Sequence, residues 1–428
     1  MTDLTKKRLL YAPQAFDYSY TICGCIRLSA ISLLSILSVV ALVSMTLAST
    51  AIGIAISNTG SASSVAQTMS PPPPSLSVNP TIYVSEPTDV IGAGRVALRL
   101  FTSTAAQSMS MCDVAYPGGF PSVITKFADV ALGIQPIVLM PLLYLPFFNE
   151  PRGLSNPIAS GSLASGFLFL DNTGSSAEPA GDHLMELYEL PPTTQGIFRP
   201  GALLTYYQNK LDERAYTLQE DRVLIFPVAR NPGSGFGFSS REIDTESNGS
   251  LNLSWMRARA GGTLGAFLAN LGATLVGSIG GNKIVEKLYD GTINYAEFNG
   301  PFLNENVGLH NQSNATYYYS DNIQEYTSIY FAFVNAKWWY AKDDAQRRAF
   351  HIERRAQMEQ GYQEALAENE RILSILPSRG LTVRTFSNST LDAMRTQWDI
   401  FVALKTTPTL SSYDAEWTEV YNIIYAVI

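Results

Sequence analysis

The sequence predicts an α/β protein with one N-terminal transmembrane helix, and three stretches support this prediction. Residues 255–301 alternate between strand and helix patterns, which is typical of α/β folds. Residues 343–376 space their apolar side chains as one long helix does. Residues 28–57 hold no charged side chain and are apolar except for small residues. About 20 apolar residues are enough to cross a bilayer.

The charges around this apolar run predict its topology. Residues 1–27 carry more positive than negative charge, and positive flanks stay on the cytoplasmic side of a membrane. We therefore expect a single-pass protein bound to the lipid bilayer through residues 28–57, with its body on the periplasmic or an equivalent non-cytoplasmic side. A cleavable signal peptide is the alternative because small residues end the run, but the run is longer than a signal peptide needs.

A Ser- and Pro-rich spacer, residues 58–89, follows the predicted anchor. It contains SPPPPSLSVNP at residues 70–80, and consecutive prolines favour an extended, semi-rigid conformation. The spacer is expected to hold the body away from the membrane.

Residues 90–230 predict a mixture of strands and helices. The segment VALRLF at 96–101 alternates as a strand does, and the proline-broken apolar run at 136–148 predicts a buried connector between strands. Residues 201–211 predict a helix, and residues 222–228 predict a strand.

The long helix is the clearest element of the chain. Asp343 and Asp344 supply an N-cap and negative charge in the first turn, and Pro377 and Gly380 end the helix. A helix of about 34 residues is ~50 Å long, enough to run from one lobe of a protein to another. The chain then ends in the apolar segment VYNIIYAVI, which is expected either to fold into the body or to contact a partner.

The composition argues against several functions. A net charge of −8, a pI near 5.1 and the lack of basic runs beyond residues 6–8 argue against a nucleic-acid partner. Three His and three Cys residues show no zinc-site spacing. The chain has no GxSxG motif and no paired-carboxylate motif, so we do not expect an enzyme.

Arg259 and Glu297 are the candidate binding residues. Arg259 stands just before a Gly-Gly turn and Glu297 just before a Gly-Pro stop, so both are placed where an α/β cleft binds a small anion. Arginine suits bidentate binding of a carboxylate. Glu297 would reach the same ligand through a sodium or calcium ion, since these cations prefer oxygen ligands. The alternative is that the two residues pair with each other in a buried interface.

Several motifs follow one another in a fixed order in the second half of the chain. They are GFSSREI at 237–243, MRARAGGTLG at 256–265, KLYDGTINYAEFNGP at 287–301, YYY at 317–319, and a Val-Asn step with Trp338 before the long helix. From about residue 233 to 391, this order resembles the solute-binding receptors of TRAP transporters, closest to the 2-oxo-acid/dicarboxylate subtype.

The resemblance implies a two-lobed, type II-like periplasmic-binding-protein fold with a spine helix. The first lobe would cover about residues 90–235, and the second lobe with the spine about residues 236–428. The ligand implied is a small organic carboxylate bound between the lobes.

The resemblance also assigns the site. Arg259 is implied to bind the carboxylate, together with Ser234, Phe298 and Gln324. A metal ion, sodium or calcium, is implied at Glu297 and Phe298. Ser234 stands where the family has glutamine, and Phe298 where it has tryptophan, so ligand use departs from the family pattern.

Two functions remain open from the sequence. The first is a membrane-tethered binding protein that passes a small organic acid to a membrane permease, and the retained Arg259 and Glu297 favour it. The second is a repurposed, non-transport accessory or structural subunit of a larger membrane complex, with lost or altered ligand binding. The predicted anchor, the divergent first lobe and the apolar C-terminal segment favour the second.

Overall fold

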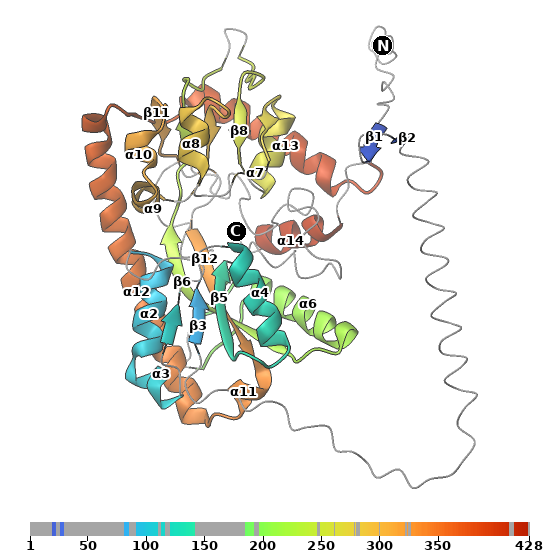
Figure 1. The fold of residues 1–428 in the computed structure, drawn as a ribbon, viewed down its shortest axis with the longest axis vertical. Coiled ribbons are helices and arrows are strands. Elements are labelled where there is room, and N and C mark those ends of the chain that lie inside the picture. Colours follow the sequence, from blue (N-terminus) through green and yellow to red (C-terminus); the bar gives the residue numbers. More distant parts are fainter. Residues whose placement is uncertain are drawn as a thin grey trace. The chain divides into compact units, whose positions relative to one another are not determined.

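Two mixed β-sheets with helices around them form the body of the protein in a computed structural model (Figure 1). The structure describes residues 19–22, 26–29, 81–84, 91–109, 113–115, 120–141, 185–191, 197–245, 249–260, 262–277, 279, 283–298, 300–321, 323, 327–410 and 415–426. The chain divides into two compact units, residues 1–72 and 73–428. In the first unit, β1 (Ser19–Ile22) pairs antiparallel with β2 (Ile26–Ser29).

The first lobe is built on a five-stranded sheet of order β4-β3-β5-β12-β6. Its first three strands are parallel, and β12 runs antiparallel to both β5 and β6. All residues of β6, residues 137–140 of β5 and residues 329–335 of β12 are buried, as expected for a sheet covered on both faces, whereas β3 and β4 are partly exposed. The strands are β3 (Thr81–Val84), β4 (Asp113–Ala115), β5 (Ile137–Pro141), β6 (Val223–Pro232) and β12 (Thr327–Asn335).

The second lobe is built on a six-stranded sheet of order β13-β11-β7-β10-β8-β9. The strands β8, β9 and β10 are parallel neighbours, and β7 is antiparallel to β10 and β11. The strands are β7 (Gly237–Ser239), β8 (Arg257–Arg259), β9 (Thr274–Leu275), β10 (Tyr295–Ala296), β11 (Tyr317–Tyr319) and β13 (Thr382–Arg384).

Helices pack on both sheets. Those of the first lobe are α2 (Ala93–Thr102), α3 (Thr104–Ser108), α4 (Phe120–Ala131), α6 (Ala202–Leu218) and α11 (Ala336–Tyr340). Those of the second are α7 (Gly262–Asn270), α8 (Ile284–Tyr289), α9 (Pro301–Asn306), α10 (Leu309–Gln312), the 3₁₀ turn η3 (Leu376–Arg379) and α13 (Asn388–Thr406). Two more, α12 (Asp344–Ile375) and α14 (Ala415–Tyr425), contact both lobes.

The chain crosses between the sheets twice outside the spine helix. It leaves the first lobe from β6 to β7, and it returns from β11 to β12. The return places residues 327–335 in the first lobe, which the sequence-based division at residues 235/236 did not foresee. The sequence could not show this because β12 is one strand among many in the second half, and its partners β5 and β6 lie far away in the chain.

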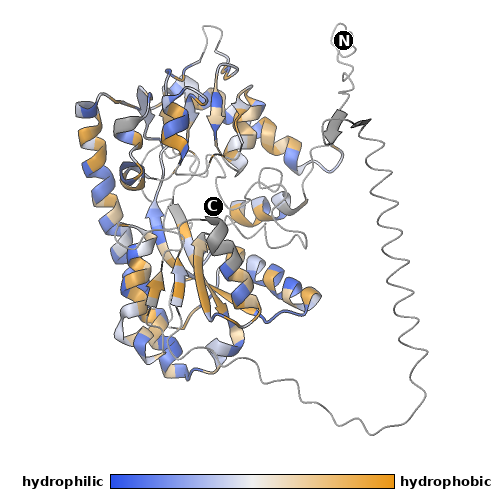
Figure 2. Ribbon diagram, viewed as in Figure 1, coloured by the Kyte–Doolittle hydropathy of each residue, from blue (hydrophilic) through white to orange (hydrophobic). Residues whose placement is uncertain are grey.

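The spine helix α12 begins where the sequence predicts. Asp343 accepts a hydrogen bond from the backbone N–H of Gln346, and the Gln346 side chain accepts from the Asp343 N–H, which forms a complete capping box. The helix packs against β6 and α2 in the first lobe and against α9 in the second. Figure 2 shows hydrophilic and hydrophobic bands alternating along its length, as expected for a helix with one buried side.

Gly361 of α12 packs directly against Val96 of α2. A Cβ at this position would stand 2.1 Å from Cγ2 of Val96, which is itself 1% exposed. Gly361→Ala is therefore expected to lower the free energy of unfolding by about 1–2 kcal/mol, since overpacking outweighs the helix propensity gained. Chemical denaturation checks this. Adding Val96→Ala should make the Gly361→Ala change neutral or stabilising relative to Val96→Ala alone, and a full loss in the double variant would contradict the contact.

The strand predicted at residues 96–101 is wrong, because these residues lie inside α2. The buried positions Val96, Ala97, Leu100 and Phe101 follow helical spacing, and the segment between them only mimics strand alternation. The predicted helix at 201–211 and the strand at 222–228 are confirmed as α6 and β6. Residues 137–141 of the expected connector form the strand β5.

The predicted transmembrane segment, residues 28–57, lies outside the described residues except for its first two, which end β2. Among the helices that the structure describes, none combines the length and hydropathy needed to cross a membrane. The spacer at 58–89 also lies outside the described residues, apart from strand β3.

The apolar C-terminal segment folds into the body through α14. Val420 and Ile424 are buried, and Trp417 contacts Trp398 of α13. In the first lobe, the Tyr206 hydroxyl of α6 donates a hydrogen bond of 3.0 Å to Glu419 of α14. Of the two expectations for this segment, packing into the body is confirmed for the residues described.

Candidate binding site of the second lobe

The candidate site forms where two neighbouring parallel strands end. Arg259 is the last residue of β8, and it lies beside Ala296, the last residue of β10. Glu297 follows directly, and its backbone N–H donates to the Arg259 carbonyl at 3.1 Å. The carboxyl ends of parallel strands are where α/β proteins bind ligands. The register therefore places a cation and a carboxylate next to each other at such an edge.

The Arg259 side chain is held by its neighbours but is not enclosed. Its Nη1 donates to the Glu297 carbonyl at 2.5 Å and lies 3.5 Å from the Glu297 carboxylate, while Nε donates to the Ile279 carbonyl at 3.4 Å. The Phe298 ring lies 5.7 Å from the guanidinium. The arginine and glutamate side chains are 23% and 16% exposed, so both remain accessible to a small ligand.

The ion pair predicted as an alternative is thus present, but its geometry is loose. At 3.5 Å the carboxylate contact is longer than a good charge-assisted hydrogen bond of about 2.7–2.9 Å. Pairing of Arg259 with Glu297 and binding of an anion by Arg259 are compatible, because an arginine carries five donors.

A glycine-rich loop from β6 to β7 lies against the same edge. Gly237 has a φ of +124°, and a Cβ there would stand 2.6 Å from the Ala296 carbonyl oxygen. This close approach requires glycine. At Gly300 a Cβ would stand 3.5 Å from the Gly233 carbonyl. Ser234 therefore belongs to a loop that borders the Arg259 and Glu297 strand ends.

Two buried tyrosines hold this loop in place through hydrogen bonds. The Tyr318 hydroxyl donates to the Ser234 carbonyl at 2.9 Å, and the Tyr295 hydroxyl donates to the Phe236 carbonyl at 2.5 Å. Burial, followed by the charge of Glu297, raises the pKa of both phenols. Both tyrosines therefore stay protonated and act as fixed hydrogen-bond donors.

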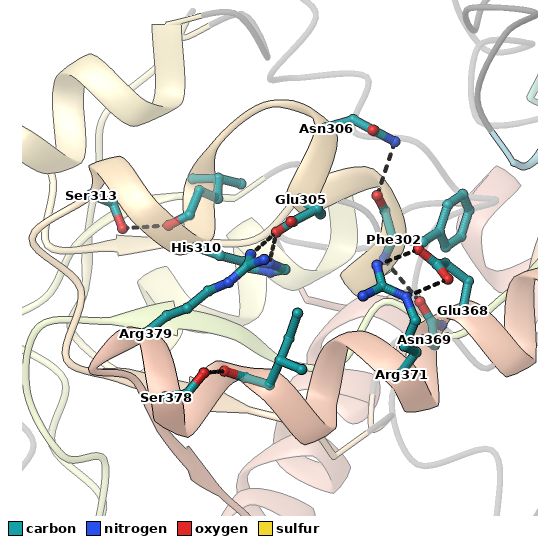
Figure 3. A network of polar contacts seen from close by, with 12 residues as sticks. Phe302, Glu305, Asn306, His310, Ser313, Glu368, Asn369, Arg371, Ser378 and Arg379 are labelled. Atoms are coloured by element: carbon teal, nitrogen blue, oxygen red, sulfur yellow. Dashed lines mark hydrogen bonds and ion pairs between the residues drawn. The ribbon is translucent and has the colours of Figure 1, made fainter.

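The segment after Glu297 is fixed to the spine helix (Figure 3). Asn369 of α12 accepts a 3.0 Å hydrogen bond from the Phe302 N–H at the start of α9. Glu305 of α9 binds Arg379 of η3 and lies 2.9 Å from Nδ1 of the buried His310. Burial lowers the pKa of His310, although Glu305 opposes the shift. These contacts tie α9, and with it the Glu297 strand end, to the end of α12.

Four of the five predicted site residues are thus placed. Arg259, Glu297 and Phe298 come together, and Ser234 is 4% exposed in the adjoining loop, where its hydroxyl donates to the Gly235 carbonyl. Gln324 lies outside the described residues.

The sequence reasoning did not identify three supporting residues, namely Tyr295, Tyr318 and Asn369. The YYY run at 317–319 marked Tyr318 as part of a motif, but its hydrogen bond to the loop depends on the pairing of β11 with β7. Asn369 gave no signal of its own, because a polar residue in a long helix usually faces solvent.

The residues present fit a cation only in part. Glu297 supplies one partly buried carboxylate, and the neighbouring Glu297 and Ile279 carbonyls both accept hydrogen bonds from Arg259. Within the described part of the chain, no group of three or more His, Cys, Asp or Glu side chains is placed to hold a metal ion. Sodium and calcium accept carbonyl oxygens as well as carboxylates. A cation here would therefore need oxygen atoms from an acid ligand or from water to complete its shell.

Part of the chain matches a known protein family. Residues 250–403 match the model of the bacterial extracellular solute-binding protein family 7, DctP. No curated protein matches the sequence.

Solved structures show the same fold. A TRAP periplasmic solute-binding protein from Pseudoalteromonas atlantica, with bound sodium and pyruvate, has a TM-score of 0.58 at 18% identity, covering 82% of this chain and 93% of its own. One from Colwellia psychrerythraea, with calcium and pyruvate, has a TM-score of 0.59 at 15% identity, with coverage of 82% and 93%. One from Bordetella bronchiseptica, with copurified calcium and picolinate, has a TM-score of 0.57 at 18% identity, with coverage of 82% and 92%. The fold is therefore the two-lobed fold of TRAP receptors.

Proposed function

We propose that this protein is a solute receptor of the TRAP type that binds a small organic carboxylate at the Arg259 strand end and passes it to a membrane permease. The observation that supports this is the register of β8 and β10, which sets Arg259 beside Glu297 at the carboxyl edge of a parallel pair. The match of residues 250–403 to family 7 and the solved structures with bound pyruvate or picolinate agree with it.

The proposed binding mode follows from the contacts of Arg259. Its guanidinium has donors beyond those that bind the Glu297 and Ile279 carbonyls. A ligand carboxylate would accept from them, while the Phe298 ring covers one side. The loop that contains Ser234 connects the lobes and closes the site from the β6–β7 side.

The proposed ligand class is a 2-oxo or related small acid bound together with sodium or calcium. A carboxylate ligand beside Glu297 would suffer repulsion between two negative charges. A cation shared by Glu297, the Phe298 region and the ligand removes this repulsion and supplies positive charge at the 2-oxo group. Arg259 then remains available to the ligand carboxylate.

The proposed location is the non-cytoplasmic side of a membrane, with residues 28–57 as the anchor. The charge pattern of residues 1–57 supports it. Protease protection of a tag placed at residue 1 in sealed vesicles, compared with a tag at residue 428, tests the orientation.

Thermal unfolding of the full chain in mild detergent tests the ligand and the cation. We expect pyruvate or another 2-oxo acid to raise the Tm by a few degrees when sodium or calcium is present, because a ligand at 100 times its Kd adds about 2.7 kcal/mol. Removing the cation with a chelator, or in a sodium-free buffer, should abolish the shift.

Glu297→Gln should remove this cation dependence, and the matched control Glu286→Gln, on the surface of α8, should keep it. Glu286 is an exposed residue that pairs with the nearby Lys283 and Lys287. If no acid shifts the Tm under any condition, the receptor proposal fails, and the non-transport accessory subunit becomes the better description.

A further inference from the structure

A cavity of about 530 Å³ lies in the first lobe. It opens beside the edge strand β6, between α6 and the first turns of α12, and none of its lining residues belongs to β8 or β10. α12 contributes residues 344, 347, 348 and 351, which the helical repeat places on one face. The volume of the cavity lies within the ~300–1,000 Å³ range of small-molecule sites.

Aromatic rings form one wall of this cavity. His351 stacks on Phe198 with ring centroids 5.0 Å apart and an interplanar angle of 7°. Phe226 meets His351 edge-on at 5.0 Å, and Trp339 lies 4.8 Å from Phe226. These four side chains come from three separate parts of the chain, so the wall is a product of the tertiary structure.

His351 is a neutral member of this wall. It is 7% exposed, and burial, followed by the charges of Arg354, Arg355 and Arg347, lowers its pKa to about 2. Its Nδ1 is buried and finds no hydrogen-bond partner in the described part of the chain. An unsatisfied buried nitrogen costs free energy.

The rim of the cavity carries more positive than negative charge. Arg222 forms a bidentate pair with Asp212 at 2.9 and 2.8 Å, and Arg347 pairs with Asp344. Arg348 is exposed, lines the cavity and has no hydrogen-bond or ion-pair partner among the residues described. Arg348 therefore lines the same cavity as the aromatic wall and is available to bind an anion.

We propose that this cavity is a second ligand site, separate from the Arg259 site, that takes an aromatic ring bearing a carboxylate. The ring packs against Phe198, Phe226 and Trp339, and the carboxylate binds Arg348. Stacking selects a flat ring over a saturated one, and the arginine selects the carboxylate over a neutral group. The site does not depend on the proposed receptor function.

Calorimetric titration of the full chain with 2-naphthoate tests this proposal, with 2-naphthamide as the neutral counterpart and a detergent blank. We expect 2-naphthoate to bind, with an affinity about tenfold higher than the amide. Arg348→Ala should remove this preference, while Arg371→Ala, an exposed arginine farther along α12, should leave it unchanged. Asn209→Trp, which fills the cavity from α6, should abolish binding, whereas Glu213→Trp one turn further on should not.

Arg259→Ala separates the two sites. Binding of 2-naphthoate should persist in this variant, while 2-oxo-acid binding is lost. The proposal is overturned if the wild-type protein does not bind 2-naphthoate, if Asn209→Trp leaves binding intact, or if Arg259→Ala abolishes it and so places the probe at the other site.

Discussion

Arg259→Ala is expected to lower the affinity for a small organic acid by at least about a hundredfold. Two charge-assisted hydrogen bonds to one carboxylate contribute about 1.5–3 kcal/mol each, and each 1.4 kcal/mol is a factor of ten in Kd. The fold should survive, because the side chain is 23% exposed and its strand is held by backbone pairing to β9 and β10. Titration calorimetry with the acid that gives the largest thermal shift measures the loss.

Arg257→Ala is the matched control for this experiment. Arg257 stands two residues earlier on the same strand, is exposed, and donates to the carbonyls of Gly291 and Thr292 rather than to the site. Its removal should change the affinity less than threefold, or about 0.6 kcal/mol. Equal losses in both variants, or an unchanged Kd in Arg259→Ala, would show that Arg259 does not bind the ligand carboxylate.

Glu189→Ala is expected to destabilise the protein by about 3–5 kcal/mol, the largest stability effect we predict. Glu189 is 8% exposed, and its two carboxylate oxygens accept hydrogen bonds of 2.8 and 2.7 Å from the same nitrogen, Nη2, of the fully buried Arg354; it also binds Arg355. Removing one partner of a buried pair leaves the other charge uncompensated. Arg354 would keep only the Pro227 carbonyl, and burial already lowers its pKa.

Chemical denaturation of a variant that breaks an exposed ion pair on α12 gives the comparison. Glu368→Ala breaks the pair of Glu368 with the exposed Arg371 and should cost about 0.5 kcal/mol or less. Replacing both buried partners, as in Glu189→Ala with Arg354→Met, should recover part of the loss, because no buried charge then lacks a partner. A double variant less stable than Glu189→Ala alone would contradict this explanation.

The Arg259 prediction tests a side chain at the end of β8, and the Glu189 prediction tests an ion pair that joins α12 to the first lobe. The ion pair of Glu189 with Arg354 joins the first half of α12 to the segment before α6. At the other end, Asn369 of α12 and Arg379 of η3 bind α9, which follows Glu297. The spine helix thus supports both the first lobe and the candidate binding edge of the second.

The sequence by itself determined the elements whose signals are local. The N-cap at Asp343 and the stop at Pro377 bound the long helix to within one residue of the observed α12, because capping depends on a few adjacent residues. It also predicted that Arg259 and Glu297 stand at strand ends, since each follows a strand pattern and precedes glycines. The strand predicted at residues 96–101 was wrong, because five apolar residues in six positions fit a strand and a helix almost equally well.

Only the tertiary structure decided which distant residues meet. The register of β8 and β10 set Arg259 beside Glu297, and the return of β12 to the first sheet joined residues nearly two hundred positions apart in β5 and β12. The aromatic wall of Phe198, Phe226, Trp339 and His351 likewise comes from separate parts of the chain. Such contacts depend on packing and strand pairing across the whole fold, and no local pattern of residues encodes them.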